Sequence, residues 1–115
     1  LKNATEMGSY LKQQLLDMMS RHRMIGEVRG MGLMIGLELV LDKRTKQFFP
    51  ARVTAEGKNI KEVVTGECYK RGLILYGAGI SSVRLSPPLM INKDDAQTAL
   101  GIIEEVISSI EEQVS

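Results

Sequence analysis

The stretch LMIGLELVL, residues 33–41, alternates in the way that is typical of a β-strand with one strongly apolar face. Side chains along a strand point to opposite faces in turn, so every second residue shares a face. The apolar face carries Leu33, Ile35, Leu37, Leu39 and Leu41, and the opposite, more polar face carries Met34, Gly36, Glu38 and Val40. Together with the residues before it, this stretch predicts one extended strand over residues 25–42, entered through a bend at Gly30 or Gly32.

Two shorter strands are predicted later in the chain. The segment LILY, residues 73–76, indicates a short strand, and GAGIS, residues 77–81, indicates a turn. The segment SVRL, residues 82–85, then forms another strand. Because proline lacks the N–H group that a strand ladder needs, Pro87 and Pro88 must end this strand.

Three segments have apolar residues spaced three and four apart, which is the spacing of an amphipathic helix. They run from Ala4 to about Met19, from about Thr54 to Arg71, and onward from Asn92, which caps the third helix. Gly72 is the expected C-terminal cap of the second helix. The apolar positions of the first helix are Ala4, Met7, Leu11, Leu15, Met18 and Met19. The inner faces comprise Ile60, Val63, Val64 and Cys68 in the second helix, and Ala96, Ala99, Leu100, Ile103, Val106, Ile107 and Ile110 in the third.

This order of elements predicts an α+β fold in one domain, residues 1–115, with a small three- to four-stranded sheet and helices packed on one face. In the strand over residues 82–85, Val83 and Leu85 point to the helices, while Arg84 points to the other face. The helices cover only the apolar side. The face that carries Arg84 therefore meets solvent or docks on polypeptide that this chain does not contain.

Composition argues against several kinds of partner. The net charge is +1 and there is no Trp among few aromatic residues, so neither nucleic acid nor an anionic membrane is an expected partner. The longest apolar run is interrupted by Glu38 and is too short to span a bilayer. A single cysteine, Cys68, fits a reducing compartment, and we expect a cytoplasmic location. The chain opens without Met in a helical segment, which predicts a piece of a longer protein.

Several candidate sites have plainer structural interpretations. The segment GMGLMIG, residues 30–36, is one residue too long for a dinucleotide fingerprint and continues as a strand instead of a helix. His22 and Cys68 are each alone, so neither a metal site nor a Cys–His nucleophile is indicated. The paired acids Glu104/Glu105 and Glu111/Glu112 are interpreted as the solvated face of the last helix. The lysines lie in polar contexts that do not predict a Schiff base, namely Lys2, Lys12, Lys43, Lys46, Lys58, Lys61, Lys70 and Lys93.

Arg84 is the one candidate for ligand binding. A guanidinium grips a carboxylate with two parallel hydrogen bonds, which fixes both position and angle. A strand is a stiff mount for such a group. The structural alternatives are that Arg84 pairs with Glu38 across the sheet or is simply solvated.

Three segments resemble the C-terminal part of class III pyridoxal-phosphate-dependent aminotransferases. They are VRGMGLMIGLELV, residues 28–40, KRGLILYGAG, residues 70–79, and the segment that begins SSVRLSPPL at residue 81 and continues through an acidic-capped helix. The order and the spacings match over nearly the whole chain. Among the members of this class, it resembles the 4-aminobutyrate, ornithine and acetylornithine aminotransferases.

The resemblance implies a fold type I enzyme, in which this chain is the small C-terminal domain. An upstream large domain, absent here, would bind the pyridoxal phosphate, so this chain would bind no cofactor itself and be inactive alone. By the same resemblance, the arginine of the R-x-x-P-P-L pattern, Arg84, binds a substrate carboxylate. The expected partners are that large domain, amino-acid and 2-oxo-acid substrates, and a second subunit in a homodimer. Decarboxylases, mutases and racemases of this class share much of the same tail.

Two alternatives remain open at this stage. The chain could be a free-standing module that senses an amino acid, with Arg84 and the GAG turn at residues 77–79 as its site. It could also be an interaction domain whose open sheet face, including Met34 and Val40, forms a dimer.

Overall fold

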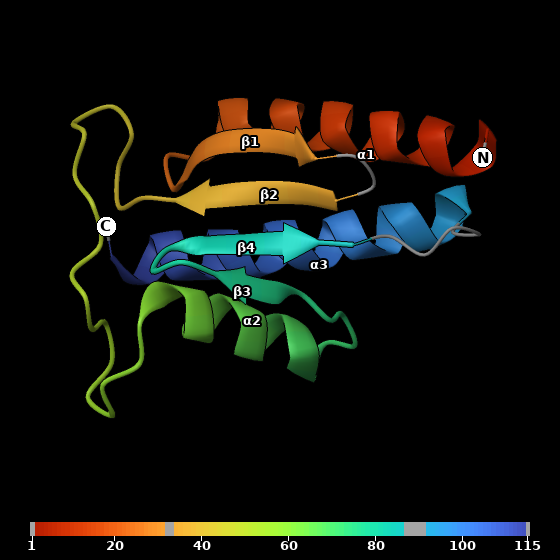
Figure 1. Ribbon diagram of the computed structural model, residues 1–115. Helices are drawn as coiled ribbons and strands as arrows, with labels where there is room; N and C mark the ends of the chain where they lie inside the picture. Colours follow the sequence, from red (N-terminus) through yellow and green to blue (C-terminus); the bar gives the residue numbers. More distant parts are fainter. Residues whose placement is uncertain (1, 32–33, 87–91, 115) are drawn as a thin grey trace.

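The computed structural model describes residues 2–31, 34–86 and 92–114 (Figure 1). Among these residues the helices and strands follow one another in the order α-β-β-α-β-β-α. Their bounds are α1 Lys2–Arg21, β1 Ile25–Met31, β2 Met34–Leu39, α2 Ile60–Lys70, β3 Tyr76–Ala78, β4 Ser82–Leu85 and α3 Lys93–Gln113. The predicted α+β class is confirmed. No helix in the described ranges is long and apolar enough to cross a membrane.

The four strands form one antiparallel sheet in the order β1-β2-β4-β3. The prediction of one extended strand over residues 25–42 was wrong, because β1 and β2 pair with each other from Ile25↔Leu39 to Met31↔Met34. A single strand over those residues would run about 60 Å at ~3.3 Å per residue, which exceeds the molecule's longest dimension of 43 Å. Gly30 continues β1, and the predicted bend at Gly32 lies outside the described residues, as does Leu33.

The helices share a single apolar core with one face of the sheet. In Figure 1, α1 and α3 run behind the strands and α2 lies along β3. The face predictions are confirmed for Ile35, Leu37, Leu39, Val83 and Leu85, which are buried. They fail beyond the end of β2, where Leu41, predicted to face inward, is only partly buried and Val40, predicted for the opposite face, is buried. All seven residues predicted for the inner face of the last helix are buried as well. The opposite face of the sheet, called the open face below, carries Glu27, Arg29, Met34, Gly36, Glu38, Tyr76, Ala78, Ser82 and Arg84.

Helix α2 begins later than predicted, at Ile60 instead of near Thr54. Asn59 is the N-cap, and it forms a capping box with Glu62 in which the Asn59 side chain accepts from the Glu62 N–H at 2.8 Å. The Glu62 carboxylate in turn accepts from the Asn59 N–H at 3.0 Å. These two bonds satisfy backbone donors that the first helical turn leaves free. Gly57 has φ +88°, a left-handed conformation that no α-helix contains.

Strand β3 is displaced along the chain from the predicted residues 73–76 to Tyr76–Ala78. The end of α2 accounts for this difference, because the Leu73 N–H donates to the Cys68 carbonyl at 2.9 Å and the Gly72 N–H donates to the Tyr69 carbonyl at 3.0 Å. Leu73 thus belongs to the C-terminal closure of the helix and cannot begin a strand. Strand β4 matches its predicted bounds, and Asn92 caps α3 as predicted. The prediction that Pro87 and Pro88 end β4 lies outside the described residues.

Two glycines near the end of α2 should respond to alanine in opposite directions. Gly72 has φ +92°, as a C-terminal glycine cap requires, whereas Gly66 lies inside α2, and a Cβ at either position would meet nothing within 4 Å. Gly72→Ala should therefore lower the free energy of unfolding by about 1 kcal/mol through backbone strain alone. Gly66→Ala should raise it by about 0.5–1 kcal/mol, because alanine is the better helix former. Urea unfolding of both variants tests the pair, and a change of the same sign in both would contradict this account.

Candidate functional site

The open face carries a row of four residues that lie opposite one another on successive strands. Arg29 on β1 pairs with Gly36 on β2, Gly36 pairs with Arg84 on β4, and Arg84 pairs with Tyr76 on β3. Residues opposite each other in a ladder share a face, so both guanidinium groups rise from the same side of the sheet. Gly36 has no side chain and separates the two arginines. Tyr76 is 56% exposed and borders the row on its other side.

Arg84 is exposed, and its guanidinium has no hydrogen bond or ion pair within residues 2–31, 34–86 and 92–114. The alternative in which Arg84 pairs with Glu38 is not what the structure shows, because Glu38 binds Arg29 instead. The flanking residues Val83 and Leu85 are buried in the core and hold the backbone of β4 in place. Arg84 is therefore a guanidinium without a partner among the described residues. It projects from a well-anchored strand on the side of the sheet that the helices leave uncovered.

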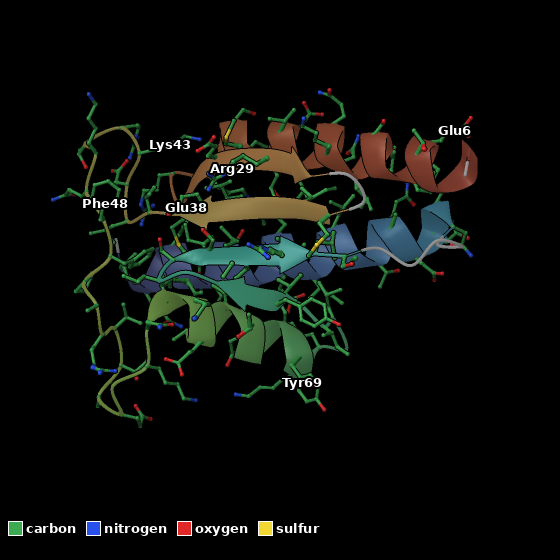
Figure 2. All side chains as sticks on the ribbon, viewed as in Figure 1. Glu6, Arg29, Glu38, Lys43, Phe48 and Tyr69 are labelled. Carbon is green, nitrogen blue, oxygen red and sulfur yellow. The ribbon has the colours of Figure 1, made fainter. Side chains whose placement is uncertain are left out.

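Glu38 is held by donors from two segments of the chain, β1 and the residues at which β4 begins. The Ser81 hydroxyl donates to its Oε1 at 2.6 Å, and the Ser82 hydroxyl donates to its Oε2. The Arg29 Nη2 donates to the same Oε2 at 3.3 Å, and Figure 2 shows Arg29 and Glu38 on neighbouring strands. Partial burial works to raise the pKa of Glu38, but the bonds from Ser81 and Ser82 and the charge of Arg29 outweigh it and lower this pKa. Glu38 thus stays an anion near neutral pH.

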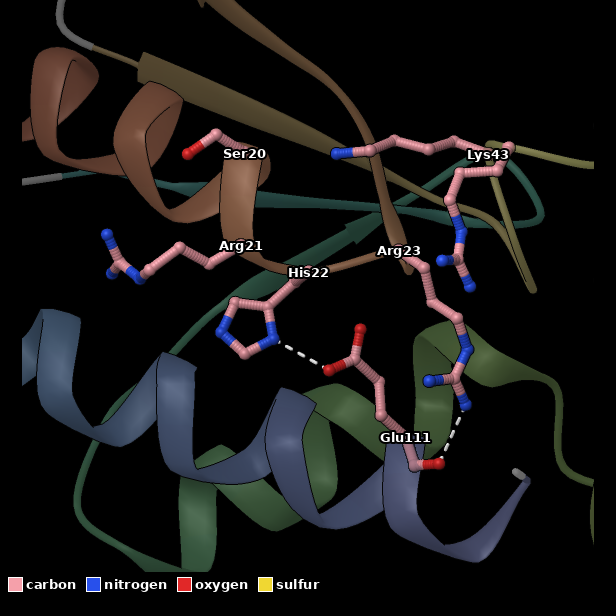
Figure 3. A pocket seen from close by; sticks show the side chains of 7 residues that line it. Ser20, Arg21, His22, Arg23, Lys43 and Glu111 are labelled. Atoms are coloured by element: carbon pink, nitrogen blue, oxygen red, sulfur yellow. Dashed lines mark hydrogen bonds and ion pairs between the residues drawn. The ribbon is translucent and has the colours of Figure 1, made fainter.

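A second polar cluster joins α1 to α3, and it was not predicted. His22 follows α1 and is buried, with its Nδ1 2.7 Å from Glu111 Oε1 and its Nε2 2.7 Å from Glu104 Oε2. Figure 3 shows this imidazole beside Glu111, whose backbone carbonyl accepts from Arg23 at 2.7 Å. The bond with His22 is the main reason that the pKa of Glu104 is lowered, with Arg21 contributing as well.

The interpretation of the paired acids as a solvated helix face was wrong for Glu104 and Glu111. Glu104 lies between His22 and Arg21, and only 12% of the Glu111 side chain is exposed. The seven-residue spacing of these two acids places them on one side of α3, two turns apart. This spacing was the signal in the sequence that both acids could contact one partner outside α3, and that partner is His22. The cluster ties two helices together and lies away from the open face, so we interpret it as structural.

The other candidate groups in the described part of the chain are the lysines, Cys68 and possible metal ligands. None of the described lysine side chains is buried, and two of them donate hydrogen bonds to backbone carbonyls. Lys43 Nζ donates to the carbonyls of Met19 and Ile25, and Lys61 Nζ donates to Gly79 O at 2.9 Å. Cys68 is fully buried, and burial raises the pKa of its thiol to about 11, which makes it an inert core residue. In the described part of the chain no group of three acidic, His or Cys residues is placed to hold a metal ion.

The glycine-rich segment at residues 30–36 does not open onto a helix. Gly30 lies near the end of β1 and Gly36 lies in β2, and both are paired within the sheet. A dinucleotide fingerprint requires a helix N-terminus at this point. A Cβ at Gly30 would lie 3.1 Å from the flexible Lys12 side chain of α1, so the close contact there is with a side chain and not with another backbone.

Comparison with known proteins gives matches over nearly the whole chain. The family model described as aminotransferase class-III matches residues 1–107. An uncharacterized aminotransferase of Bacillus subtilis, YodT, is 34% identical over 121 residues, which cover 99% of this chain and 26% of that protein. The leucine/methionine racemase of Thermococcus litoralis is 38% identical over 112 residues, which cover 97% of this chain and 24% of that protein.

A solved structure matches the fold as well. The omega transaminase from Pseudomonas jessenii in complex with PMP superimposes with a TM-score of 0.81 and 26% sequence identity. The match covers 97% of this chain and 23% of that one. The chain thus spans about a quarter of the length of the relatives that it matches.

Proposed function

Because the chain belongs to the class III aminotransferase family, we propose that it is the small C-terminal domain of a pyridoxal-phosphate-dependent aminotransferase. The whole enzyme would move an amino group from an ω- or α-amino acid, such as 4-aminobutyrate, to a 2-oxo acid. An upstream large domain would bind the cofactor, and the enzyme would act as a homodimer. The chain matches only about a quarter of the length of its relatives, which supports the presence of a further, larger domain in the whole enzyme.

The observation that carries the proposal is the position of Arg84. It is an exposed guanidinium on a rigid strand, unpaired among the described residues, on the one sheet face that no helix covers. A planar fork in this setting suits a carboxylate, which it can bind through two parallel hydrogen bonds. Arg84 would thereby fix the distance and angle of the amino acid relative to the reacting centre.

The described residues offer no lysine suited to an imine with the cofactor, and no step of the chemistry is assigned to this chain. The cofactor, held by the large domain, would supply the electron sink for the reaction. The part of this chain is to bind and orient the substrate. On that account the 115-residue chain by itself should transfer no amino group.

An isotope experiment with the full-length protein tests the proposed reaction. The protein is given a panel of α- and ω-amino acids labelled with 15N, together with pyruvate or 2-oxoglutarate. We expect the label to appear in alanine or glutamate, because an aminotransferase passes the amino group to the 2-oxo acid. The 115-residue chain serves as the control and should give no labelled product.

The family relatives define the result that would overturn the proposal. A leucine/methionine racemase is among the proteins that this chain resembles. If the full-length protein formed the opposite enantiomer of an amino acid and left the 2-oxo acid unlabelled, it would be a racemase and not an aminotransferase. If no member of the panel reacted in either way, the assignment of an amino-acid substrate would fail.

A further inference from the structure

Glu38 lies where it could neutralise Arg84. Gly36 is opposite Arg84 and Glu38 is opposite Ser82, so Glu38 and Arg84 are diagonal neighbours on adjacent strands and share the open face. Diagonal neighbours have Cβ atoms roughly 7–8 Å apart or slightly less, which long side chains span with ease. An ion pair between them would occupy the guanidinium and exclude any other carboxylate. The structure nevertheless contains no such pair.

Both oxygens of the Glu38 carboxylate are already engaged elsewhere. Oε1 accepts from Ser81 at 2.6 Å, and Oε2 accepts from Ser82 and from Arg29 Nη2. Arg29 lies on β1, on the other side of β2 from Arg84, so it draws the carboxylate away from β4. The two serines fix the carboxylate at the start of β4, two residues or more before Arg84.

Arg29 also neutralises a second acid. Glu27 lies directly opposite Glu38 on the neighbouring strand, and the Arg29 Nε is 3.9 Å from Glu27 Oε1. Two carboxylates opposite each other repel when nothing lies between them. Without Arg29, this repulsion would drive Glu38 toward another cation, and Arg84 is its diagonal neighbour on β4.

We propose that Arg29, Ser81 and Ser82 are positioning residues that hold Glu38 away from Arg84 and so keep its guanidinium free for a substrate carboxylate. This inference rests on the proposed function of Arg84. On this proposal, Arg29 in the VRG segment, residues 28–30, affects substrate affinity without touching the substrate. Glu38 and the substrate carboxylate would compete for Arg84 within one molecule. The apparent affinity for the substrate is then scaled by the fraction of molecules in which Arg84 is unpaired.

Steady-state kinetics of the full-length enzyme test the inference. The substrates are the amino acid that reacts fastest in the panel and the amine that corresponds to it without the carboxylate. Arg29→Gln should raise KM for the amino acid roughly fivefold, which is the factor expected from a competing exposed ion pair of about 1 kcal/mol. Its kcat and the KM for the amine should stay within about twofold, because neither depends on the freedom of Arg84.

The double variant Arg29→Gln with Glu38→Gln provides the decisive comparison. A glutamine at position 38 cannot form an ion pair with Arg84, so KM for the amino acid should return to within about twofold of the parent value. Ser82→Ala should give a smaller rise in the same KM, and it serves as the second variant if Arg29→Gln folds poorly. Arg44→Gln is the matched control, because Arg44 is exposed and its ion pair with Asp42 involves neither Glu38 nor Arg84.

Two results would overturn the inference. The first is a high KM that persists in the double variant, which would mean that Arg29 acts on the substrate in some way other than through Glu38. The second is an equal rise of KM for the amine, which would indicate a general disturbance of the site. Failure of the proposed function has a different signature, because Arg84→Lys would then leave the amino acid and the amine equally affected.

Discussion

Arg84→Lys in the full-length enzyme is expected to raise KM for the amino-acid substrate about 30-fold or more. Lysine keeps the positive charge but loses the planar fork that binds a carboxylate through two parallel bonds. Truncating one partner of a desolvated charge pair costs about 2–5 kcal/mol, and about 2 kcal/mol already corresponds to a factor of roughly 30 in affinity. The amine without a carboxylate should change less than about threefold. Initial rates with both substrates over a range of concentrations measure this difference.

The same substitution at Arg29 is the matched control for Arg84→Lys. Arg29 lies in the same row of the open face, and the only charged partners that the described residues give it are Glu27 and Glu38. A lysine there retains the charge that holds Glu38, so KM for the amino acid should change only about twofold. Because Arg84 is exposed, its replacement should alter the free energy of unfolding by less than about 0.5 kcal/mol. A comparable loss with the amine, or with Arg29→Lys, would show that Arg84 does not recognise the carboxylate.

The sequence was most informative where a local period decides the structure. The alternation of residues 33–41 identified the buried face of β2, and the three-four spacing identified every buried position of α3 that was named. Both periods follow from backbone geometry alone, because burial on one side selects the same residue type at each repeat. Arg84 was found in the same way, as a charged residue on the uncovered side of a strand.

The errors occurred where a distant contact or a cap decides the structure. Residues 25–42 predicted a strand with a bend at Gly30 or Gly32, but a local pattern could not show that the two halves pair with each other as a hairpin. The start of α2 is set by the capping box of Asn59 and Glu62. This capping pattern was present in the sequence as N-x-x-E, and residues 54–59 hold no apolar residue three or four positions before Ile60, so the cap was the better signal for the start of the helix.

The candidate site shows the same division between local and distant effects. That Arg84 points to the open face follows from the strand period, but whether it is paired depends on where Glu38 goes. Glu38 is bound by residues from β1 and from the turn before β4, and only the sheet order β1-β2-β4 brings these segments together. A two-way choice between an ion pair with Glu38 and solvation therefore could not be decided from sequence.

The cluster around His22 provides the second large expected effect, on stability. Glu111 accepts hydrogen bonds from two groups near the start of β1, namely the imidazole of His22 at 2.7 Å and the backbone N–H of Met24 at 3.1 Å. Met24 is fully buried and His22 nearly so, and water therefore cannot replace the carboxylate easily.

Glu111→Ala is therefore expected to lower the free energy of unfolding of this chain by about 2–4 kcal/mol. The variant leaves one buried backbone donor and one imidazole nitrogen without an acceptor, and each such loss costs about 1–3 kcal/mol. Glu105→Ala is the control on the same helix. Glu105 is exposed and pairs only with Arg71 among the described residues, so its loss should cost less than about 1 kcal/mol. Glu111→Gln should fall between the two, because its amide oxygen still accepts one hydrogen bond while the charge opposite His22 is gone. Urea unfolding followed by circular dichroism measures all three, and equal losses for Glu111→Ala and Glu105→Ala would show that the contact between α1 and α3 does not depend on this carboxylate.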